Sequence, residues 1–159
     1  MRLWLLRHGE AGAPSRRDAD RELTAHGRQQ VAEMASHLKD QPLAGIVCSP
    51  YVRARQTTDI VLEVLGVEKP TLIVPWLVPD EPVQSVVRQL DSLPEGDLLL
   101  VSHQPMLGLL GSWLCEGSLA QPLPLGTASL ACLEGDFAVS GLMHLQSLQH
   151  PRTGMFQNG

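Results

Sequence analysis

The sequence predicts an α/β protein, a three-layer α/β/α sandwich with a mostly parallel central sheet. Of the 159 residues, 43% are apolar, enough for a sizeable core, and short apolar runs alternate with segments of helical periodicity. Strands that alternate with helices pair in parallel, and the helices cover both faces of the sheet. No linker, internal repeat or low-complexity segment interrupts the alternation. We expect one domain over residues 1–150 and a loosely held tail over residues 151–159.

The elements expected in the first half of the chain follow from local signals. A short apolar run at residues 2–6, bounded by polar and glycine-containing sequence, predicts a buried strand. Thr24 suits a helix N-cap and Gly66 a helix C-cap, while four prolines in residues 67–82 predict an extended loop. The expected elements are a strand at 2–6, a helix from 25 to about 39, a strand at 43–48, a helix at 52–65 and a short edge strand around 71–74.

The second half continues the alternation. Residues 97–103, with the sequence Asp-Leu-Leu-Leu-Val-Ser-His, form the clearest strand signal of the chain. The apolar residues of 105–117 are better explained by a buried helix than by a partner surface. The expected elements are a helix at 82–93, a strand at 97–103, a helix at 105–117 and two strands at 128–134 and 142–148.

Composition and charge argue against several function classes. Residues 1–60 carry nine Lys/Arg and seven Asp/Glu, whereas residues 61–159 carry three and ten, for a net charge of −5. This acidic balance argues against nucleic-acid binding, and an anion site belongs in the basic N-terminal part. The three cysteines are far apart, so we expect reduced core thiols and no metal site.

No membrane association and no cofactor are expected. Four apolar residues before Arg7 are too few for a signal peptide, and no apolar run of about 18 residues follows. The predicted location is therefore the cytoplasm. Gly9 and Gly12 do not form a G-x-G-x-x-G motif, and the same segment lacks the Lys-Ser/Thr ending of a P-loop.

Arginine and histidine side chains stand at or just after the ends of three of the predicted strands. Arg7 and His8 come directly after the first, Arg53 lies on the helix after the second, and His103 is the last residue of the clearest one. In an open parallel sheet the carboxyl ends of the strands share one edge, where ligands bind, so we expect these side chains to converge. The helix after Pro50 adds the partial positive charge of its N-terminus. The combination predicts a pocket for a dianion such as phosphate, with imidazoles beside it.

Four segments at these positions resemble, in order, the motifs of the histidine phosphatase superfamily, which includes the phosphoglycerate mutases. The short chain, with no insertion that could form a lid, and the segment Pro-Leu-Gly-Thr-Ala-Ser-Leu-Ala-Cys-Leu-Glu near its end resemble the SixA-type branch. The resemblance implies removal of phosphate from phosphohistidine on proteins. The four segments are Arg-His-Gly at 7–9, Leu-Thr-Ala-His-Gly-Arg-Gln-Gln at 23–30, Ser-Pro-Tyr-Val-Arg-Ala-Arg-Gln-Thr at 49–57 and Ser-His-Gln-Pro at 102–105.

The resemblance also implies roles for the converging residues. His8 is the nucleophile and becomes transiently phosphorylated. The side chains of Arg7, Arg53 and His103 hold the phosphoryl oxygens. A nucleophilic imidazole must be neutral, and nearby guanidinium groups disfavour its protonation. Gly9 allows close backbone approach, and its carbonyl is a candidate acceptor for the Nδ1–H of His8, which leaves Nε2 facing the phosphorus.

Two further contributions to catalysis are less specific. The backbone N–H of Gln104 is a candidate phosphate donor. Mutases and ester phosphatases of the superfamily place an acidic proton donor in a segment comparable to residues 75–82, where only Asp80 and Glu81 could serve. An alkoxide leaving group needs that proton, whereas an imidazole that is already protonated leaves readily.

The sequence therefore favours a phosphohistidine-bearing protein, such as a phosphorelay or phosphotransferase component, as substrate and partner. A small-molecule phosphomonoesterase, with Asp80 or Glu81 as acid, is the first alternative, and a non-catalytic phosphoprotein-binding regulator is the second. Arg16, Arg17 and Arg21 follow His8 and either guide an acidic partner or form a solvated loop balanced by nearby acids. Trp76 either contacts substrate or packs on the sheet.

Overall fold

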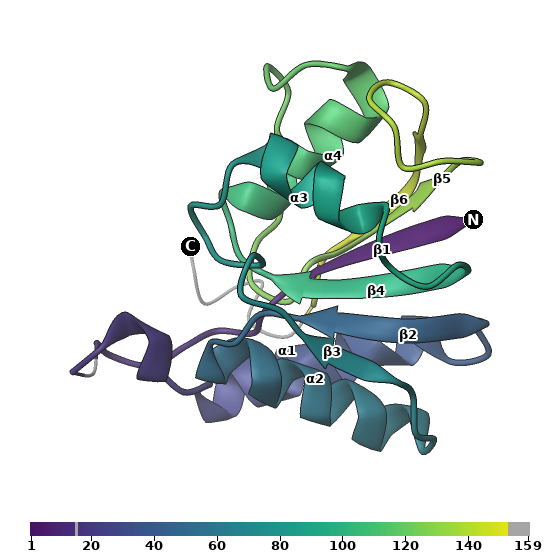
Figure 1. Cartoon of the computed structure of the whole chain (residues 1–159). Coiled ribbons are helices and arrows are strands. Elements are labelled where there is room, and N and C mark those ends of the chain that lie inside the picture. The colour runs from purple at the N-terminus through teal and green to yellow at the C-terminus, as the bar shows by residue number, and fades with distance from the viewer. Residues whose placement is uncertain (15, 153–159) are drawn as a thin grey trace.

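A computed structural model describes residues 1–14 and 16–152 and has the predicted three-layer architecture (Figure 1). The strands of its six-stranded sheet are β1 (Arg2–Arg7), β2 (Leu43–Cys48), β3 (Thr71–Ile73), β4 (Asp97–Ser102), β5 (Leu130–Glu134) and β6 (His144–Gln149). The α-helices are α1 (Ala25–Ala35), α2 (Val52–Leu65), α3 (Val83–Leu90) and α4 (Met106–Glu116). Two short 3-10 helices are η1 (Asp18–Asp20) and η2 (Ser36–Leu38).

The sheet is mostly parallel, with the strand order β3-β2-β4-β1-β5-β6. The strands from β3 to β1 in this order pair in parallel, whereas β5 runs antiparallel to β1, and β6 antiparallel to β5. Arg7 of β1 pairs with Ser102 of β4, and Cys48 of β2 pairs with Val101 of β4. The carboxyl ends of β1, β2 and β4 are therefore level at one edge of the sheet.

Two helices cover each face of the sheet: α1 and α2 pack on one, α3 and α4 on the other (Figure 1). Neighbouring residues of a strand point to opposite faces. Leu3 and Leu5 therefore enter the core under α3 and α4, while Trp4 and Leu6 enter the core under α1 and α2. Burial on both faces explains why β1 is a continuous apolar run rather than an alternating one.

The helix ends follow the local signals. The Oγ1 of Thr24 accepts a hydrogen bond from the backbone N–H of Gly27 at 2.9 Å, which caps α1. The regular helix has 11 residues and ends at Ala35, and the predicted remainder to residue 39 begins as the 3-10 helix η2. Gly66 ends α2 with a φ of 67°, a conformation that glycine adopts without steric cost.

The apolar helix α4 belongs to the core, because Met106 and Leu107 are buried. Two of the predicted core thiols, Cys48 and Cys132, are also buried, and burial raises the pKa of each to about 11. Cys115 is only half-buried because it lies in the last turn of α4, where the helix reaches the surface. No helix in the described part of the chain is long and apolar enough to cross a membrane.

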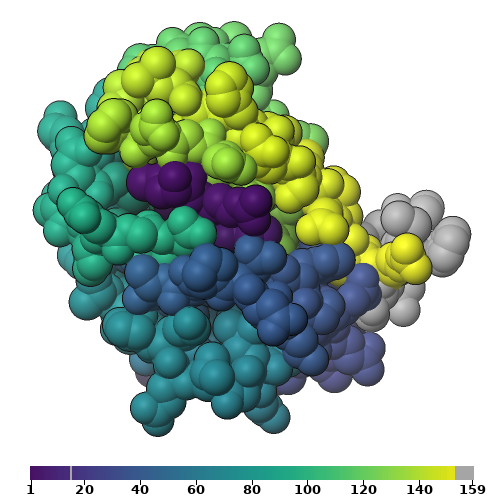
Figure 2. Space-filling model, turned by 90° about the vertical axis from the view of Figure 1, so that its right-hand side faces the viewer, coloured from purple at the N-terminus to yellow at the C-terminus, as the bar shows by residue number. Residues whose placement is uncertain are grey.

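The start of the predicted tail is held against the body of the protein. Pro151 is buried, and the backbone N–H of Arg152 donates to Oε2 of Glu33 at 2.7 Å. The rest of that tail, residues 153–159, lies outside the described residues. From the side at which β1 begins, the first residues of the chain reach the surface between the C-terminal and the middle segments (Figure 2). The amino end of β1 thus faces away from the edge that carries Arg7.

Candidate active site

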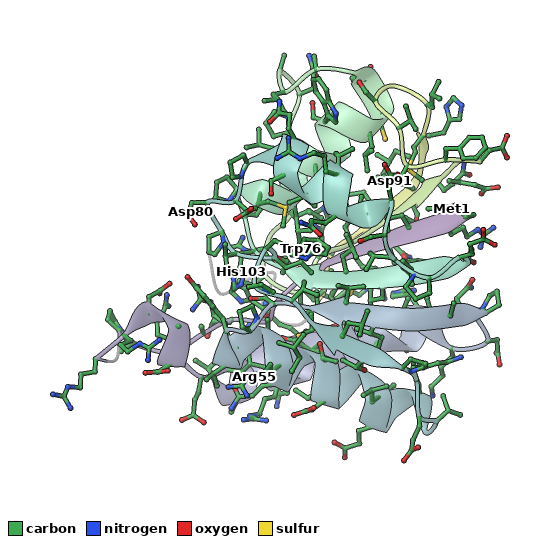
Figure 3. All side chains as sticks on the ribbon, in the orientation of Figure 1. Met1, Arg55, Trp76, Asp80, Asp91 and His103 are labelled. Atoms are coloured by element: carbon green, nitrogen blue, oxygen red, sulfur yellow. The ribbon has the colours of Figure 1, made fainter. Side chains whose placement is uncertain are left out.

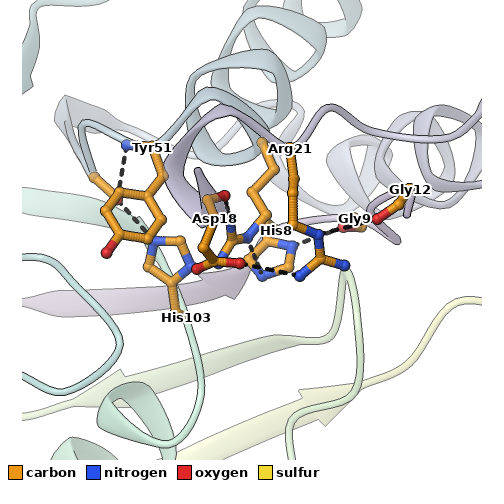
Figure 4. A network of polar contacts seen from close by, with 9 residues as sticks. His8, Gly9, Gly12, Asp18, Arg21, Tyr51 and His103 are labelled. Carbon is orange, nitrogen blue, oxygen red and sulfur yellow. Dashed lines mark hydrogen bonds and ion pairs between the residues drawn. The ribbon is translucent and has the colours of Figure 1, made fainter. Parts of the chain in front are cut away.

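The level strand ends bring the four predicted side chains into one pocket of about 400 Å³. Arg7 and His8 leave β1, His103 leaves β4, and Arg53 lies in the first turn of α2, which follows β2. The loops are tied to one another by the backbone, since the N–H of His8 donates to the carbonyl of Ser102 at 3.1 Å. Figure 4 shows the polar contacts that connect these loops at the pocket.

His8 is held as a neutral imidazole with its Nε2 toward the guanidinium of Arg53. Its Nδ1 lies 2.7 Å from the carbonyl of Gly9, which can only accept, so Nδ1 carries the proton. The Nε of Arg53 donates to Nε2 at 3.3 Å, so Nε2 carries the lone pair. The pKa of His8 is lowered to about 4. Burial is the largest cause, the Gly9 carbonyl opposes it, and the charges of Arg53, Arg7 and Arg21 act in the same direction as burial. Desolvation is thus a larger cause than the guanidinium groups.

His103 faces His8 across the pocket, with ring centroids 5.1 Å apart. Its Nε2 lies 2.7 Å from Oγ of Ser49, whereas its Nδ1 is buried without a protein partner. Figure 4 shows this second nitrogen on the side of Asp18 and His8. The pKa of His103 is lowered to about 3, first by burial and then by His8 and Arg53, while Asp18 opposes them. A neutral ring can still donate one hydrogen bond into the pocket if Nδ1 carries its proton.

The two predicted guanidinium groups differ in their partners. Nη1 of Arg7 donates to the carbonyl of Leu125 at 2.9 Å, while its Nε is buried without a partner. Burial, together with the charge of Arg53, lowers the pKa of Arg7. Nη1 and Nη2 of Arg53 instead donate to the carbonyl oxygen and Oδ2 of Asp18, at 2.7 and 3.1 Å. Arg53 also lies over the ring of Tyr51, at 4.9 Å from its centroid.

Gly9 is required by close packing on the first turn of α1. A Cβ at Gly9 would lie 2.6 Å from the carbonyl oxygen of Gly27 and 2.8 Å from Cγ2 of Val31. The backbone N–H of Gly9 donates to Oγ1 of Thr57 at 3.1 Å, and that hydroxyl donates to the carbonyl of Arg53 at 2.8 Å. Thr57 therefore ties the loop that carries His8 to the helix that carries Arg53.

Asp18, Ser49 and Thr57 contribute contacts at the site but have no role among the expectations from sequence. Ser49 and Thr57 are the first and last residues of the segment 49–57, so the family-like motif was the available signal for them. Asp18 had none, because it stands among alternating arginines and acids that are typical of a solvated loop. Its contact with Arg53 joins residues 35 positions apart and depends on how the loop folds back.

Of the other predicted residues, Gln104 lines the pocket and the two candidate acids do not. Gln104 lines the pocket, where its side chain donates to the carbonyl of Leu123 at 3.0 Å and accepts from the N–H of Gly108 at 2.6 Å. Asp80 and Glu81 do not line it; Asp80 is exposed, and Oε1 of Glu81 accepts from the hydroxyl of Ser85 at 2.7 Å. Figure 3 shows Asp80 at the periphery and His103 further inside.

Of the three arginines that follow His8 in the chain, one lies at the pocket and two lie at the surface. Arg21 lines the pocket and donates through Nε to the carbonyl of Gly12 at 3.0 Å. Arg16 is exposed, and Arg17 pairs at 3.9 Å with Asp20 at the surface.

Trp76 is half-buried and packs against the core under α3 and α4, away from the pocket lining. In the described residues, no group of three His, Cys, Asp or Glu side chains is arranged to hold a metal ion.

Comparisons with known proteins agree with this geometry. Residues 3–74 match the model of the histidine phosphatase superfamily (branch 1). The phosphohistidine phosphatase SixA of Escherichia coli (strain K12) is 31% identical over 151 residues, which cover 92% of each chain. The adenosylcobalamin/alpha-ribazole phosphatase of Salmonella typhi is 40% identical over 82 residues, 48% of this chain and 39% of that protein.

The solved structure of the protein histidine phosphatase SixA complexed with tungstate superimposes with a TM-score of 0.85 at 29% identity. The alignment covers 95% of this chain and 97% of that one, so it includes both the strands and the edge that carries the pocket. Sequence, topology and the matched relatives lead to one assignment: the chain belongs to the histidine phosphatase superfamily.

Proposed function

We propose that this hydrolase removes the phosphoryl group from phosphohistidine on a protein, through a phospho-His8 intermediate. The observation that carries the proposal is the neutral, buried His8, whose Nε2 lone pair faces the guanidinium of Arg53 in a pocket that Arg7 also lines. The similarity to phosphohistidine phosphatase SixA supports the same substrate class. The pocket combines the nucleophile with donors for phosphoryl oxygens, as phosphoryl transfer requires.

In the first step, Nε of Arg53 transfers its hydrogen bond from Nε2 of His8 to the phosphoryl group. The freed lone pair on Nε2 attacks phosphorus, and the P–N bond to the substrate imidazole breaks. The electron pair of that bond returns to the substrate ring, which leaves as a neutral imidazole because its other nitrogen is protonated. Arg7, Arg53 and the Nδ1–H of His103 stabilise the phosphoryl charge. In the second step, water attacks the phosphorus of phospho-His8, the P–Nε2 bond breaks, and inorganic phosphate leaves with neutral His8 restored.

The pocket carboxyl groups support a P–N substrate. Of the described residues that line the pocket, Glu10 and Asp18 carry carboxyls. Burial acts to raise the pKa of Asp18, but hydrogen bonds from Arg53 and Arg21 outweigh it and lower that pKa. Oε1 of Glu10 accepts from the hydroxyl of Thr24 at 2.9 Å. An ionised Asp18 is a poor proton donor for an alkoxide, whereas a protonated imidazole needs none.

The test compares a phosphorylated histidine phosphotransfer domain with a panel of small phosphate esters. We expect faster turnover of the phosphoprotein and an acid-labile phosphoenzyme that His8→Asn abolishes. His37→Asn is the matched control, because His37 is an exposed histidine outside the pocket lining. Faster turnover of the esters would favour the second candidate, a phosphomonoesterase, which the similarity to an alpha-ribazole phosphatase supports. Binding of the phosphoprotein with no phosphoenzyme would instead indicate a non-catalytic regulator.

A further inference from the structure

The loop between β1 and α1 folds back onto the pocket, where Asp18 and Arg21 line it. Two backbone hydrogen bonds join the two ends of this loop: the N–H of Gly12 donates to the carbonyl of Glu22 at 2.8 Å, and the N–H of Thr24 donates to the carbonyl of Glu10 at 3.0 Å. Between these ends the loop extends past the edge of the sheet and contains the 3-10 helix η1 (Figure 1). Asp18, the first residue of η1, returns to the pocket wall and contacts α2 there.

All three nitrogens of the Arg53 guanidinium already have protein partners. Nε donates to the nucleophilic Nε2 of His8 at 3.3 Å, Nη1 to the backbone carbonyl of Asp18 at 2.7 Å, and Nη2 to its Oδ2 at 3.1 Å. The other carboxylate oxygen, Oδ1, accepts from Nη1 of Arg21 at 3.2 Å. The Asp18 carboxylate therefore bridges two cations in the position of an anionic ligand.

Two other donor groups at the pocket differ from Arg53. Nε of Arg7 and Nδ1 of His103 are both buried and have no protein partner. A buried polar group without a partner is costly, so both are available to an incoming oxygen anion. The pocket thus holds two donor groups without a protein partner, on Arg7 and His103, beside an Arg53 whose guanidinium already pairs with a carboxylate of the same chain.

We propose that Asp18 is a specificity-determining residue whose carboxylate competes with the phosphoryl group for Arg53. This inference rests on the proposed function, since it takes phosphate to be the ligand of the pocket. A phosphoryl group that gains Arg53 displaces the carboxylate and loosens the segment 16–22. Inorganic phosphate and small esters have few other contacts to offset that displacement, whereas a phosphorylated protein has an extended surface that can do so. The same competition favours release of inorganic phosphate after hydrolysis.

The first test measures binding of inorganic phosphate by titration calorimetry to the wild type, Asp18→Asn and Asp20→Asn. Asp20 is the matched control: it lies in the same 3-10 helix and changes net charge equally, but pairs with Arg17 and not with Arg53. We expect Asp18→Asn to bind phosphate about three- to tenfold more tightly, the range given by a partly exposed ion pair plus removal of carboxylate–phosphate repulsion. Asp20→Asn should stay within about twofold of the wild type.

Equal or weaker phosphate binding by Asp18→Asn would overturn the inference and leave the proposed function intact. If neither the wild type nor any variant binds phosphate, the phosphate site itself is wrong, and the proposed function fails with it.

A second measurement needs no variant. Saturating phosphate should speed tryptic cleavage of the wild type after Arg16 and Arg17, because the segment loses its attachment to Arg53; unchanged or slower cleavage would contradict displacement.

Discussion

Ser49 is predicted to determine which nitrogen of His103 carries the proton. Its hydroxyl is fully buried and lies 2.7 Å from Nε2 of His103, while its oxygen accepts from the backbone N–H of Tyr51 at 3.2 Å. Since that oxygen already accepts one bond, its own proton is available to Nε2. His103 then carries its proton on Nδ1, the buried nitrogen without a protein partner. Ser49→Ala removes this constraint and allows the other tautomer, which presents a lone pair to a phosphoryl oxygen.

The size of the effect follows from the two bonds lost. A neutral hydrogen bond contributes about 1 kcal/mol net, and a buried group left without a partner costs about 1–3 kcal/mol. We therefore expect Ser49→Ala to lower the free energy of unfolding by roughly 1–3 kcal/mol. Loss of the Nδ1–H donor in half or more of the molecules, together with a less fixed ring, should lower kcat/KM about tenfold, equivalent to roughly 1.4 kcal/mol of transition-state stabilisation.

Urea unfolding, single-turnover phosphoryl transfer and ¹⁵N NMR of the histidine rings measure these three quantities. Ser112→Ala is the matched control, because Ser112 is 1% exposed and its hydroxyl donates to the carbonyl of Ser118 at 2.6 Å and accepts from Gln121 at 3.1 Å. It lies outside the pocket lining, so we expect a similar loss of stability with unchanged turnover. Wild-type turnover and an unchanged His103 tautomer in Ser49→Ala would refute the reasoning.

Three further predictions concern acid stability, packing and the proton donor. His8 is neutral when folded, with a pKa lowered from 6.5 to about 4, so an unfolded chain binds a proton there that the folded one does not. The free energy of unfolding should therefore be unaffected by His8 above pH 6.5 and should fall by up to about 3 kcal/mol as the pH is lowered to 4. Urea unfolding at a series of pH values measures this loss, which should be smaller in His8→Asn. Gly27→Ala should lower the free energy of unfolding by about 1–3 kcal/mol, because its Cβ would overlap the carbonyl of Glu10. Alanine normally favours a helix over glycine by about 1 kcal/mol, so an increase in the free energy of unfolding measured in urea would contradict this packing. The double variant Asp80→Asn/Glu81→Gln should turn over phosphoprotein and esters at rates within about twofold of the wild type, because neither side chain lines the pocket. A tenfold loss of ester turnover would indicate that one of the two is the proton donor.

Most elements of the fold were predictable because their signals are local. Apolar runs, the N-cap at Thr24 and the C-cap at Gly66 depend on a few neighbouring residues, and the structure has each of them where expected. The direction of β5 and β6 was not predictable, because a strand's side-chain pattern is the same whether its partner runs parallel or antiparallel. That direction depends on the path of the chain after α4.

What the sequence determined by itself was the meeting of Arg7, His8, Arg53 and His103, because residues that end parallel strands must share one edge whatever the details of packing. Only the tertiary structure decided the state of those groups. The hydrogen bond between Ser49 and His103 joins residues 54 positions apart, and the return of Asp18 to Arg53 depends on the fold of a charged loop. The lowered pKa of His8 arises first from burial, and desolvation exists only once helices and strands from distant parts of the chain exclude water from the pocket.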